Sequence, residues 1–285
     1  MPRITLALAQ INTRLGDVTR NLEAHLSYID EAKRLSADVI QYPGLSLTGC
    51  ALQDITPCVA CEATSEDPIF KHLLEASQGI DIVAGFVEAD SRMRFRIASA
   101  YLSGGKVLHV HRKVYLAIYG LFDEGRFFAR GDHVRAFDTP FGRVGILICE
   151  DFWHASPPYL LWLDGADMML FCSASPGRGL NRDPLLDSTR WVEHINQAYA
   201  SLFTTFVAHA NRAGFEDGLN FWGGSTVFDP DGQLIAQGPQ HEEALTPAQI
   251  DPGQLHRTRS RLPLLRDERP ELLLSELKRI LEQRA

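Results

Sequence analysis

The first half of the chain alternates short apolar runs with amphipathic segments. Residues 4–11 read I-T-L-A-L-A-Q-I, and a second apolar run, D-V-I-Q-Y, ends at Tyr42. Between these runs, apolar residues recur at the spacing of one helix face: Leu22, Leu26, Ile29 and Ala32. Asp17 stands before them as a candidate N-cap. We therefore predict a strand, a helix and a second strand.

The rest of the chain continues this alternation. A helical segment, D-P-I-F-K-H-L-L-E-A-S, is followed by three successive apolar runs: I-V-A-G-F-V-E, I-A-S-A-Y-L and K-V-L-H-V-H-R-K. Later strands read V-G-I-L-I-C, D-M-M-L-F-C-S-A-S and T-T-F-V-A-H-A, and helices are expected near Y-L-L-W-L and D-S-T-R-W-V-E-H-I-N-Q-A-Y-A-S. D-P-D-G is the expected turn of a last hairpin. This mixture of consecutive strands and strand–helix alternation predicts a layered α/β fold with mixed sheets.

The C-terminal segment is predicted to be a separate amphipathic helix. It begins near Pro270 and carries a stripe of Leu273, Leu277 and Leu281. We expect residues 1–260 to form one domain and residues 261–285 to form a tail that docks on this domain or on a partner subunit, docking on its own domain being the more frequent case.

Composition and charge exclude several classes of function. The 285 residues are 45% hydrophobic and 22% charged, which is ordinary for a globular protein, and no run of eighteen apolar residues predicts a membrane span. The formal net charge is −8 and the basic residues are scattered, which argues against a nucleic-acid partner. The N-terminus lacks the regions of a signal peptide, so we expect a cytoplasmic protein.

The five cysteines favour reduced thiols, because the count is odd and no secretion signal is present. Cys58 and Cys61 form C-V-A-C, which could be a redox or metal pair. No second C-x-x-C and no histidines at ligand spacing accompany it, so two unrelated thiols are the favoured interpretation. We expect neither a metal nor another cofactor.

The stretch V-G-I-L-I-C-E-D-F-W-H carries the strongest chemical signal. Its apolar run ends at Cys149, and an acidic pair then opens a predicted helix. Ligands of α/β proteins bind beyond the carboxyl ends of strands, and a thiol near a helix N-terminus can have a lowered pKa. Cys149 is therefore a candidate nucleophile, although a buried inert thiol is the alternative; Cys172, inside a strand, has the pattern of ordinary core packing.

A second candidate, Lys113, stands where the alternation of K-V-L-H-V-H-R-K ends and an aromatic loop begins. By itself it would be a solvated lysine at a strand end. Beside a nucleophilic thiol, its ammonium could stabilise the oxyanion of a tetrahedral intermediate.

With these two residues placed, the sequence resembles the nitrilase superfamily of carbon–nitrogen hydrolases, above all its amidases and the glutaminase domain of glutamine-dependent NAD synthetases. The resemblance rests on ordered segments that cover almost the whole chain: A-Q-I-N, Y-P-G-L-S-L-T-G-C, H-R-K-V-Y-L, F-D-E-G-R-F-F, I-C-E-D-F-W, S-A-S-P-G-R-G, A-N-R-A-G and R-D-E-R-P-E-L. Each segment alone is weak evidence, and their shared order makes the assignment specific.

The resemblance implies a four-layer αββα sandwich, pairing of subunits into a homodimer or larger oligomer, and a Glu-Lys-Cys triad. The cysteine would be Cys149, the lysine Lys113, and a second glutamate that supports the lysine and substrate would be Glu124. In the family, the cysteine attacks a nitrile or amide carbon, the lysine stabilises the intermediate, and the triad glutamate transfers the protons.

Position 44, where the resemblance places the triad glutamate, is Gly44. Glycine has no side-chain proton acceptor, and general acid–base catalysis contributes roughly 10²–10⁴-fold. Cys50, where the family often has Tyr, is a second departure that affects the packing of the same loop.

Three explanations of Gly44 compete. The chain could be a natural relative that lost hydrolysis and kept its pocket, or an active enzyme whose glutamate was replaced. In the third, another group acts as the base: Glu124 first, with Glu150, His111 and His154 behind it. The third ranks lowest because catalytic groups cannot be moved by several ångströms, and natural divergence is modestly favoured over replacement.

Tyr119, Glu150 and Trp153 are candidates for the walls of a substrate pocket, and the loop after S-A-S-P-G-R-G, with Asn181 and Arg182, is a weaker one. The sequence therefore predicts a carbon–nitrogen hydrolase homologue that acts on a small amide through Cys149 and is weakly active or inactive. The alternative is a non-catalytic binding or scaffold protein that keeps the fold and the pocket.

Overall fold

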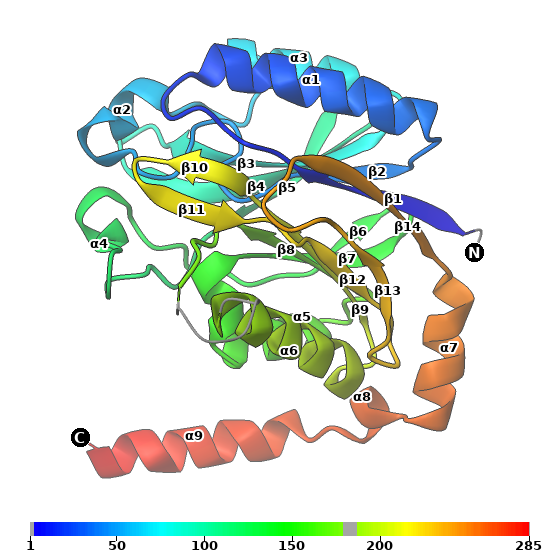
Figure 1. Cartoon of the computed structure of the whole chain (residues 1–285). Coiled ribbons are helices and arrows are strands. Elements are labelled where there is room, and N and C mark those ends of the chain that lie inside the picture. Colours follow the sequence, from blue (N-terminus) through cyan, green and yellow to red (C-terminus); the bar gives the residue numbers. More distant parts are fainter. Residues whose placement is uncertain (1–2, 179–186, 285) are drawn as a thin grey trace.

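Two six-stranded mixed sheets form the centre of the protein, as seen in a computed structural model that describes residues 3–178 and 187–284 (Figure 1). The first sheet has the order β14 (Ala244–Ile250), β1 (Ile4–Gln10), β2 (Val39–Gln41), β3 (Asp81–Ala89), β4 (Phe95–Ser103) and β5 (Lys106–Arg112). The second has the order β13 (Leu234–Gln237), β12 (Thr226–Phe228), β9 (Phe206–Asn211), β8 (Met168–Ser173), β7 (Gly142–Ile148) and β6 (Phe137–Thr139).

Each sheet combines parallel and antiparallel pairs, as the sequence predicts. In the first, β1, β2 and β3 run parallel, while β14, β4 and β5 are attached antiparallel. In the second, β7, β8 and β9 run parallel, and the flanking strands are antiparallel. The carboxyl ends of the parallel strands are where α/β proteins place their sites.

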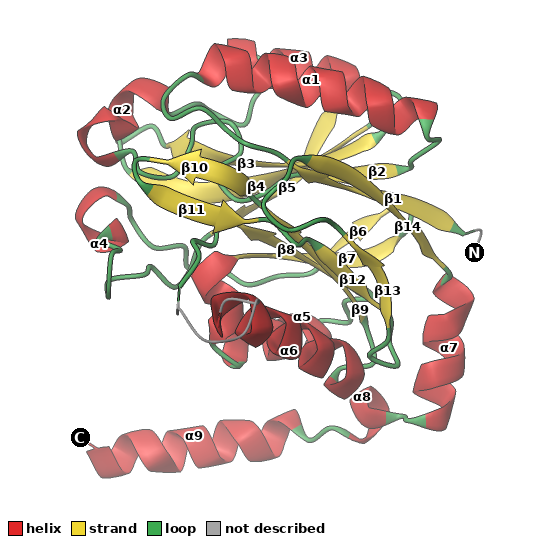
Figure 2. Ribbon diagram, viewed as in Figure 1, coloured by secondary structure: helices red, strands yellow, loops and turns green. Residues whose placement is uncertain are grey.

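Helices cover the outer face of each sheet, which confirms the predicted four-layer αββα sandwich (Figure 2). The helices α1 (Val18–Arg34) and α3 (Pro68–Ala76) cover the first sheet, and α5 (Ser156–Leu163) and α6 (Asp187–Leu202) cover the second. Asp17 caps α1 as predicted, since its carboxylate accepts the N–H of Arg20 at 3.2 Å. Apart from the C-terminal helix, the remaining described elements are η1 (Gln53–Ile55), α2 (Thr56–Val59), α4 (Glu124–Phe127), η2 (Cys149–Trp153), β10 (Ala213–Glu216), β11 (Leu219–Trp222), α7 (Pro252–Arg261) and α8 (Leu264–Asp267).

The inner faces of the two sheets share one apolar core. Leu6 and Leu8 of β1 belong to the same buried cluster as Ile146 of β7 and Leu170 of β8. Gln41 of β2 crosses this layer and donates to the carbonyl of Phe171 at 2.8 Å. The sheets therefore cannot slide independently, and this fixes the strand ends that carry the candidate site.

The C-terminal helix α9 (Pro270–Arg284) extends away from the sandwich (Figure 1). It begins at Pro270, as predicted, and every residue from Pro270 to Arg284 is exposed, the leucines included. In this single chain the helix therefore leaves its apolar stripe uncovered. Its docking on a partner subunit stays a prediction, as does the domain boundary at residue 260.

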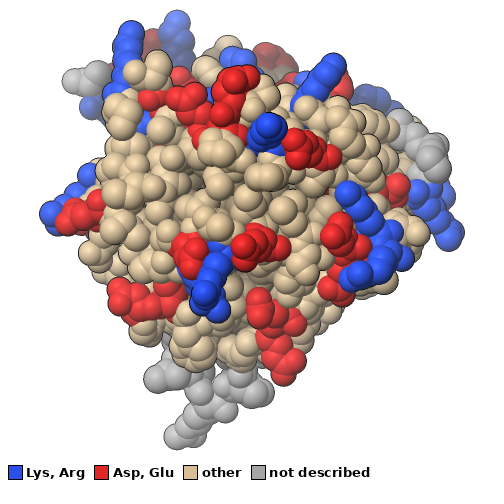
Figure 3. All heavy atoms as spheres, turned by 90° about the horizontal axis from the view of Figure 1, so that it is seen from above, with Lys and Arg blue, Asp and Glu red and all other residues tan. Residues whose placement is uncertain are grey.

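Charges of both signs are interspersed on the face seen from above in Figure 3, where no field of one sign dominates. This agrees with the scattered basic residues of the sequence. None of the helices in the described part of the chain is long and apolar enough to cross a bilayer.

Candidate active site

Four sequence-predicted positions, Gly44, Lys113, Glu124 and Cys149, line one small cavity of about 20 Å³. Gly44 follows β2, Lys113 follows β5, and Cys149 follows β7, so the three come from different strand ends of the two sheets. We call this space the central cavity; the remaining residues that line it are Leu45, Cys50, Ile97, Ala117, Phe122, Ile148 and Ala174. The fold thus brings the implied Lys and Cys positions together with the glycine at position 44.

Cys149 occupies a strained turn at the end of a buried strand. Its φ of 47° lies in the left-handed region, which non-glycine residues rarely adopt. Backbone strain of this kind is common at functional sites. The following segment is a five-residue 3₁₀ helix, in place of the α-helix that the sequence suggested.

The pKa of the Cys149 thiol is raised, and the expectation of a lowered value is wrong. Burial is the main cause, and the carboxylates of Glu124 and Glu150 raise it further, while the charge of Lys113 and a hydrogen bond with Ser175 lower it. Two nearby carboxylates and desolvation thus outweigh one ammonium. The resting thiol keeps its proton at neutral pH and needs an acceptor before it can attack.

Lys113 is held as an ammonium by a bidentate ion pair. Its Nζ donates to both oxygens of Glu124 at 2.6 and 2.7 Å, and its side chain is 2% exposed. Burial lowers the pKa of Lys113, but the charge of Glu124 and its hydrogen bonds act in the opposite direction and leave that pKa raised. Glu124 also accepts the N–H of Ala117 at 2.8 Å, so both of its oxygens are engaged.

Gly44 contributes no functional group to the central cavity. Among the described residues that line it, Glu124 supplies the only carboxylate. A Cβ added to Gly44 would lie 3.1 Å from the carbonyl oxygen of Cys172, a close but tolerable contact if β8 yields by a few tenths of an ångström. A side chain at position 44 would therefore be crowded. Without one, this part of the cavity wall has no carboxylate that could accept a proton.

The other candidate bases are engaged elsewhere. Glu150 accepts a hydrogen bond from Tyr119 Oη at 2.8 Å. His111 is bonded to Asp151 at 2.8 Å, and the ring of His154 stacks on that of Tyr115. Glu150 is the only one of these three that lines a cavity with Cys149.

A larger cavity of about 380 Å³ opens on the other side of Cys149, and we call it the Arg178 cavity. Tyr119, Glu150 and Trp153, the predicted wall residues, all line it. The Arg178 guanidinium lies over the ring of Tyr119 at 5.5 Å. Burial and Glu150 raise the pKa of Tyr119 to about 12, so its hydroxyl remains a donor. The cavity that Cys149 lines therefore also holds the guanidinium of Arg178 and the carboxylates of Glu150 and Asp187.

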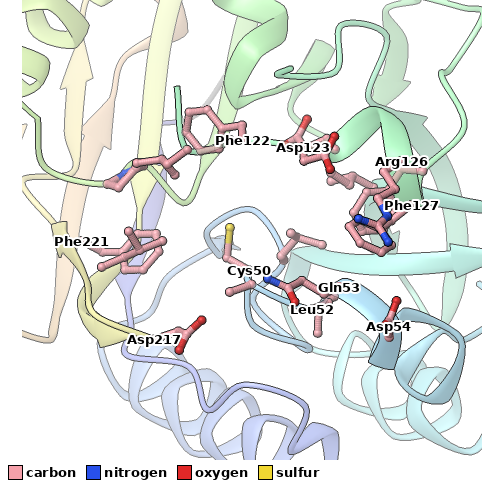
Figure 4. A pocket seen from close by; sticks show the side chains of 18 residues that line it. Cys50, Leu52, Gln53, Asp54, Phe122, Asp123, Arg126, Phe127, Asp217 and Phe221 are labelled. Carbon is pink, nitrogen blue, oxygen red and sulfur yellow. The ribbon is translucent and has the colours of Figure 1, made fainter. Parts of the chain in front are cut away.

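A third cavity, of about 390 Å³, lies beyond Phe122 on the side of Cys50 (Figure 4). Phe122 lines all three cavities. The sulfur of Cys50 points into this space, between Phe122 and Asp217. Burial raises the pKa of Cys50 to about 12, so its thiol stays neutral. Cys50, the second departure from the family pattern, thus lines both this cavity and the central cavity.

Several functional candidates escaped the sequence reasoning. Ser175 and Arg178 lie within the quoted S-A-S-P-G-R-G, which pointed to their segment but not to their roles. Asp151 lies within the quoted I-C-E-D-F-W, but that segment did not show its role, and Glu216 lies in none of the quoted segments. Both accept hydrogen bonds from backbone groups that are remote in sequence. Asn181 and Arg182 lie outside the described residues.

The described part of the chain also bears on the metal and C-V-A-C expectations. Within residues 3–178 and 187–284, no group of three or more His, Cys, Asp or Glu side chains could hold a metal ion. Cys58 is exposed while Cys61 is buried, and both thiols are free. The two thiols of C-V-A-C thus differ in exposure, and their interpretation as unrelated cysteines stays a prediction.

The chain is similar to known proteins in sequence and in fold. A glutamine-dependent NAD synthetase of Thermotoga maritima is 29% identical over 257 residues, which are 88% of this chain and 42% of that enzyme. A carbon-nitrogen hydrolase from Helicobacter pylori superposes with a TM-score of 0.85 at 21% identity, covering 97% of this chain and 98% of the other. An amidase from Nesterenkonia sp. gives 0.79 at 23% identity, with 95% of each chain covered.

The two structural likenesses show the fold alone, and this chain spans less than half the length of the synthetase. The family itself is shown by a match along the sequence from residue 5 to residue 260. The chain therefore belongs to the carbon-nitrogen hydrolase family.

Proposed function

We propose that this protein is an amidase homologue in which Cys149 attacks a small polar amide, with low turnover because position 44 has no carboxylate. The observation that carries the proposal is the shared wall of the central cavity, where Cys149, Lys113 and Glu124 meet beside Gly44. A nucleophile, an oxyanion-stabilising cation and its anchor are present, and the proton acceptor is absent.

The chemistry follows from these groups. The sulfur of Cys149 bonds to the amide carbon, and the oxyanion that forms is stabilised by the Lys113 ammonium. The thiol proton must reach the leaving amine as the C–N bond breaks, and water then releases the acyl group from the thioester. Because Glu124 is bound to Lys113 through both oxygens, it is a poor acceptor for that proton. We therefore expect a rate deficit of roughly 10²–10⁴-fold.

The Arg178 cavity favours an amide that carries both charges. The Arg178 guanidinium suits a carboxylate and the Glu150 carboxylate suits an ammonium. Glutamine has both groups, and the Thermotoga maritima relative is glutamine-dependent by name. These points support glutamine as the first substrate to test.

A non-catalytic binding role is the second candidate, and the missing carboxylate together with the raised pKa of Cys149 favours it. In that case glutamine would bind in the Arg178 cavity and remain intact.

We also propose a cytoplasmic location, since all five thiols are free, and a homodimer or larger oligomer, since α9 is exposed.

Ammonia release from a panel of amides tests the proposal, with glutamine, asparagine, carbamoyl compounds and short aliphatic amides included. The unsubstituted chain is compared with Gly44→Glu and with Gly44→Ala. The alanine variant is the matched control, because both substitutions add the same Cβ near the carbonyl of Cys172. We expect kcat/KM of Gly44→Glu to exceed that of Gly44→Ala by roughly 10²–10⁴-fold on at least one amide.

The enzyme proposal fails if none of the three proteins releases ammonia and iodoacetamide labels Cys149 no faster than the core thiol Cys172. Calorimetric binding of glutamine to the unsubstituted chain without turnover would then support the binding role.

A further inference from the structure

A single buried carboxylate, that of Asp151, ties together the two backbone segments that carry Lys113 and Cys149. Its side chain is fully buried and both of its oxygens accept hydrogen bonds. Oδ1 accepts the N–H groups of Val114 and Tyr115, each at 2.9 Å. Oδ2 accepts the N–H of Ile148 at 3.1 Å.

The fourth partner is His111, whose Nε2 lies 2.8 Å from Oδ2. The imidazole is 1% exposed, so this contact is shielded from water. The Asp151 oxygens accept the backbone N–H groups, and we assign the donor role in this contact to Nε2 of the imidazole. Hydrogen bonds to a carboxylate are stronger than those between neutral groups, so these four contacts hold the two segments firmly.

The partners of Asp151 are direct chain neighbours of the reacting residues. Val114 follows Lys113 at the end of β5, which is the edge strand of the first sheet. Ile148 precedes Cys149 at the end of β7, which belongs to the second sheet (Figure 1). The two reacting residues thus come from different sheets, and one carboxylate contacts the backbone beside both.

We propose that Asp151, oriented by His111, is a positioning residue that sets the placement of the Cys149 thiol relative to the Lys113 ammonium. The inference rests on the proposed function for its catalytic meaning, but the placement of the thiol can be measured without turnover. Besides His111, the hydrogen-bond partners of Asp151 are backbone N–H groups, so it acts through its neighbours. A displacement of about 1 Å at a reacting centre can cost 10²-fold in rate.

Replacement of Asp151 by Asn changes the hydrogen bonds unequally. The amide oxygen still accepts the N–H groups of Val114 and Tyr115. The amide NH₂ then faces the N–H of Ile148, so two donors oppose each other next to Cys149. The side chain keeps its size, and the imidazole of His111 can turn to its accepting tautomer. The fold is therefore retained while the Cys149 turn shifts.

Alkylation of Cys149 by iodoacetamide in the full chain, followed as a function of pH by mass spectrometry of the labelled peptide, tests the proposal. We expect Asp151→Asn to lower the plateau rate at high pH by about 10–100-fold. A buried carboxylate outside the site provides the control: Asp81 is 6% exposed and accepts a hydrogen bond from Tyr101 at 2.8 Å. Asp81→Asn should alter the plateau by less than about twofold.

Two variants test the orienting role of His111. Gln places an amide donor near the position of Nε2, so His111→Gln should retain most of the plateau rate. His111→Phe removes the donor and should lower it about tenfold. If both His111 variants behave alike, the role given to His111 is wrong.

The positioning role of Asp151 is overturned if Asp151→Asn leaves the plateau rate unchanged, or if Asp81→Asn lowers it equally, since general loosening would then explain the loss. It is also overturned if the midpoint of the pH profile shifts and the plateau does not, because the effect would then be electrostatic. These outcomes are independent of ammonia release, so failure of the proposed function is a separate result. If Gly44→Glu turns over glutamine, adding Asp151→Asn should lower kcat and leave KM within about twofold.

Discussion

The ion pair between Lys113 and Glu124 predicts a large and pH-dependent loss of stability when the glutamate is neutralised. The Nζ–Oε1 distance is 2.6 Å, and the two side chains are 2% and 16% exposed. At an effective dielectric constant of about 20, the gross attraction is about 6 kcal/mol. Much of this offsets the cost of removing both charges from water, but removing one partner of a buried pair costs about 3–5 kcal/mol.

We expect Glu124→Gln to lower the free energy of unfolding by about 3 kcal/mol at pH 7, the low end of that range, because the amide oxygen still accepts one hydrogen bond from Lys113. The matched control is Glu75→Gln, the same substitution at an exposed pair with His72 at 3.9 Å. That control should change the stability by less than about 0.5 kcal/mol. Urea unfolding measures both.

The pH dependence has a definite sign. In the unsubstituted chain the folded pKa of Lys113 is raised, so its contribution is fully present below the unfolded pKa of about 10.4 and is lost only above it. Without Glu124, burial dominates and the folded pKa falls below the unfolded value. Folding then penalises the charged form, so Glu124→Gln should gain stability relative to the unsubstituted chain as the pH rises from 7 to 10.

A second variant separates charge from packing. Adding Lys113→Met to Glu124→Gln removes the unpaired ammonium, so part of the lost stability and the added pH dependence should disappear. The reasoning is refuted if Glu124→Gln costs less than 1 kcal/mol, or if its stability relative to the unsubstituted chain does not change between pH 7 and 10.

Three further predictions follow from single contacts. Because the pKa of Cys149 is raised, the rate of its labelling by iodoacetamide should keep increasing above pH 8.5. The midpoint of this pH profile should lie above the ordinary thiol pKa of about 8.5. Gly85→Ala should cost about 1–3 kcal/mol in urea unfolding, because the added Cβ would lie 2.5 Å from the carbonyl oxygen of Pro43. Tyr119→Phe removes the 2.8 Å hydrogen bond to Glu150, and we expect several-fold weaker glutamine binding by calorimetry with the fold unchanged.

Each of these has a simple control. A labelling midpoint at or below 8.5 would contradict the burial argument for the thiol. Gly79→Ala places its Cβ 3.7 Å from Lys33, an ordinary contact, and should leave stability nearly unchanged; equal losses at both glycines would remove the steric explanation. Tyr159→Phe alters a tyrosine outside the Arg178 cavity. If Tyr159→Phe and Tyr119→Phe weaken glutamine binding equally, the hydrogen bond from Tyr119 to Glu150 does not contribute to glutamine affinity.

Local patterns in the sequence predicted most of the fold. Apolar runs and helical spacing gave the strands and helices, since both depend on neighbours a few residues apart. The predicted N-cap at Asp17 and the start of the tail helix at Pro270 agree with the structure for the same reason. The arrangement of the layers came from family resemblance, because many non-local strand pairings are compatible with one pattern.

The direction of the Cys149 pKa could not be predicted, because it depends on burial and on charges that lie close only in the folded chain. The strand end suggested a lowered value, whereas Glu124 and Glu150 approach from separate segments. The short 3₁₀ helix after Cys149 replaces the α-helix whose N-terminus was expected to favour the thiolate.

The sequence by itself determined which chemical groups are available: a thiol at 149, an ammonium at 113, and no carboxylate at 44. No folding event can supply a side chain that Gly44 lacks. Only the tertiary structure decided how these groups act on one another, because Lys113 and Cys149 belong to different sheets and meet through long-range packing. The same packing buries Asp151 between their backbones, commits Glu124 to Lys113, and leaves the central cavity without a free proton acceptor.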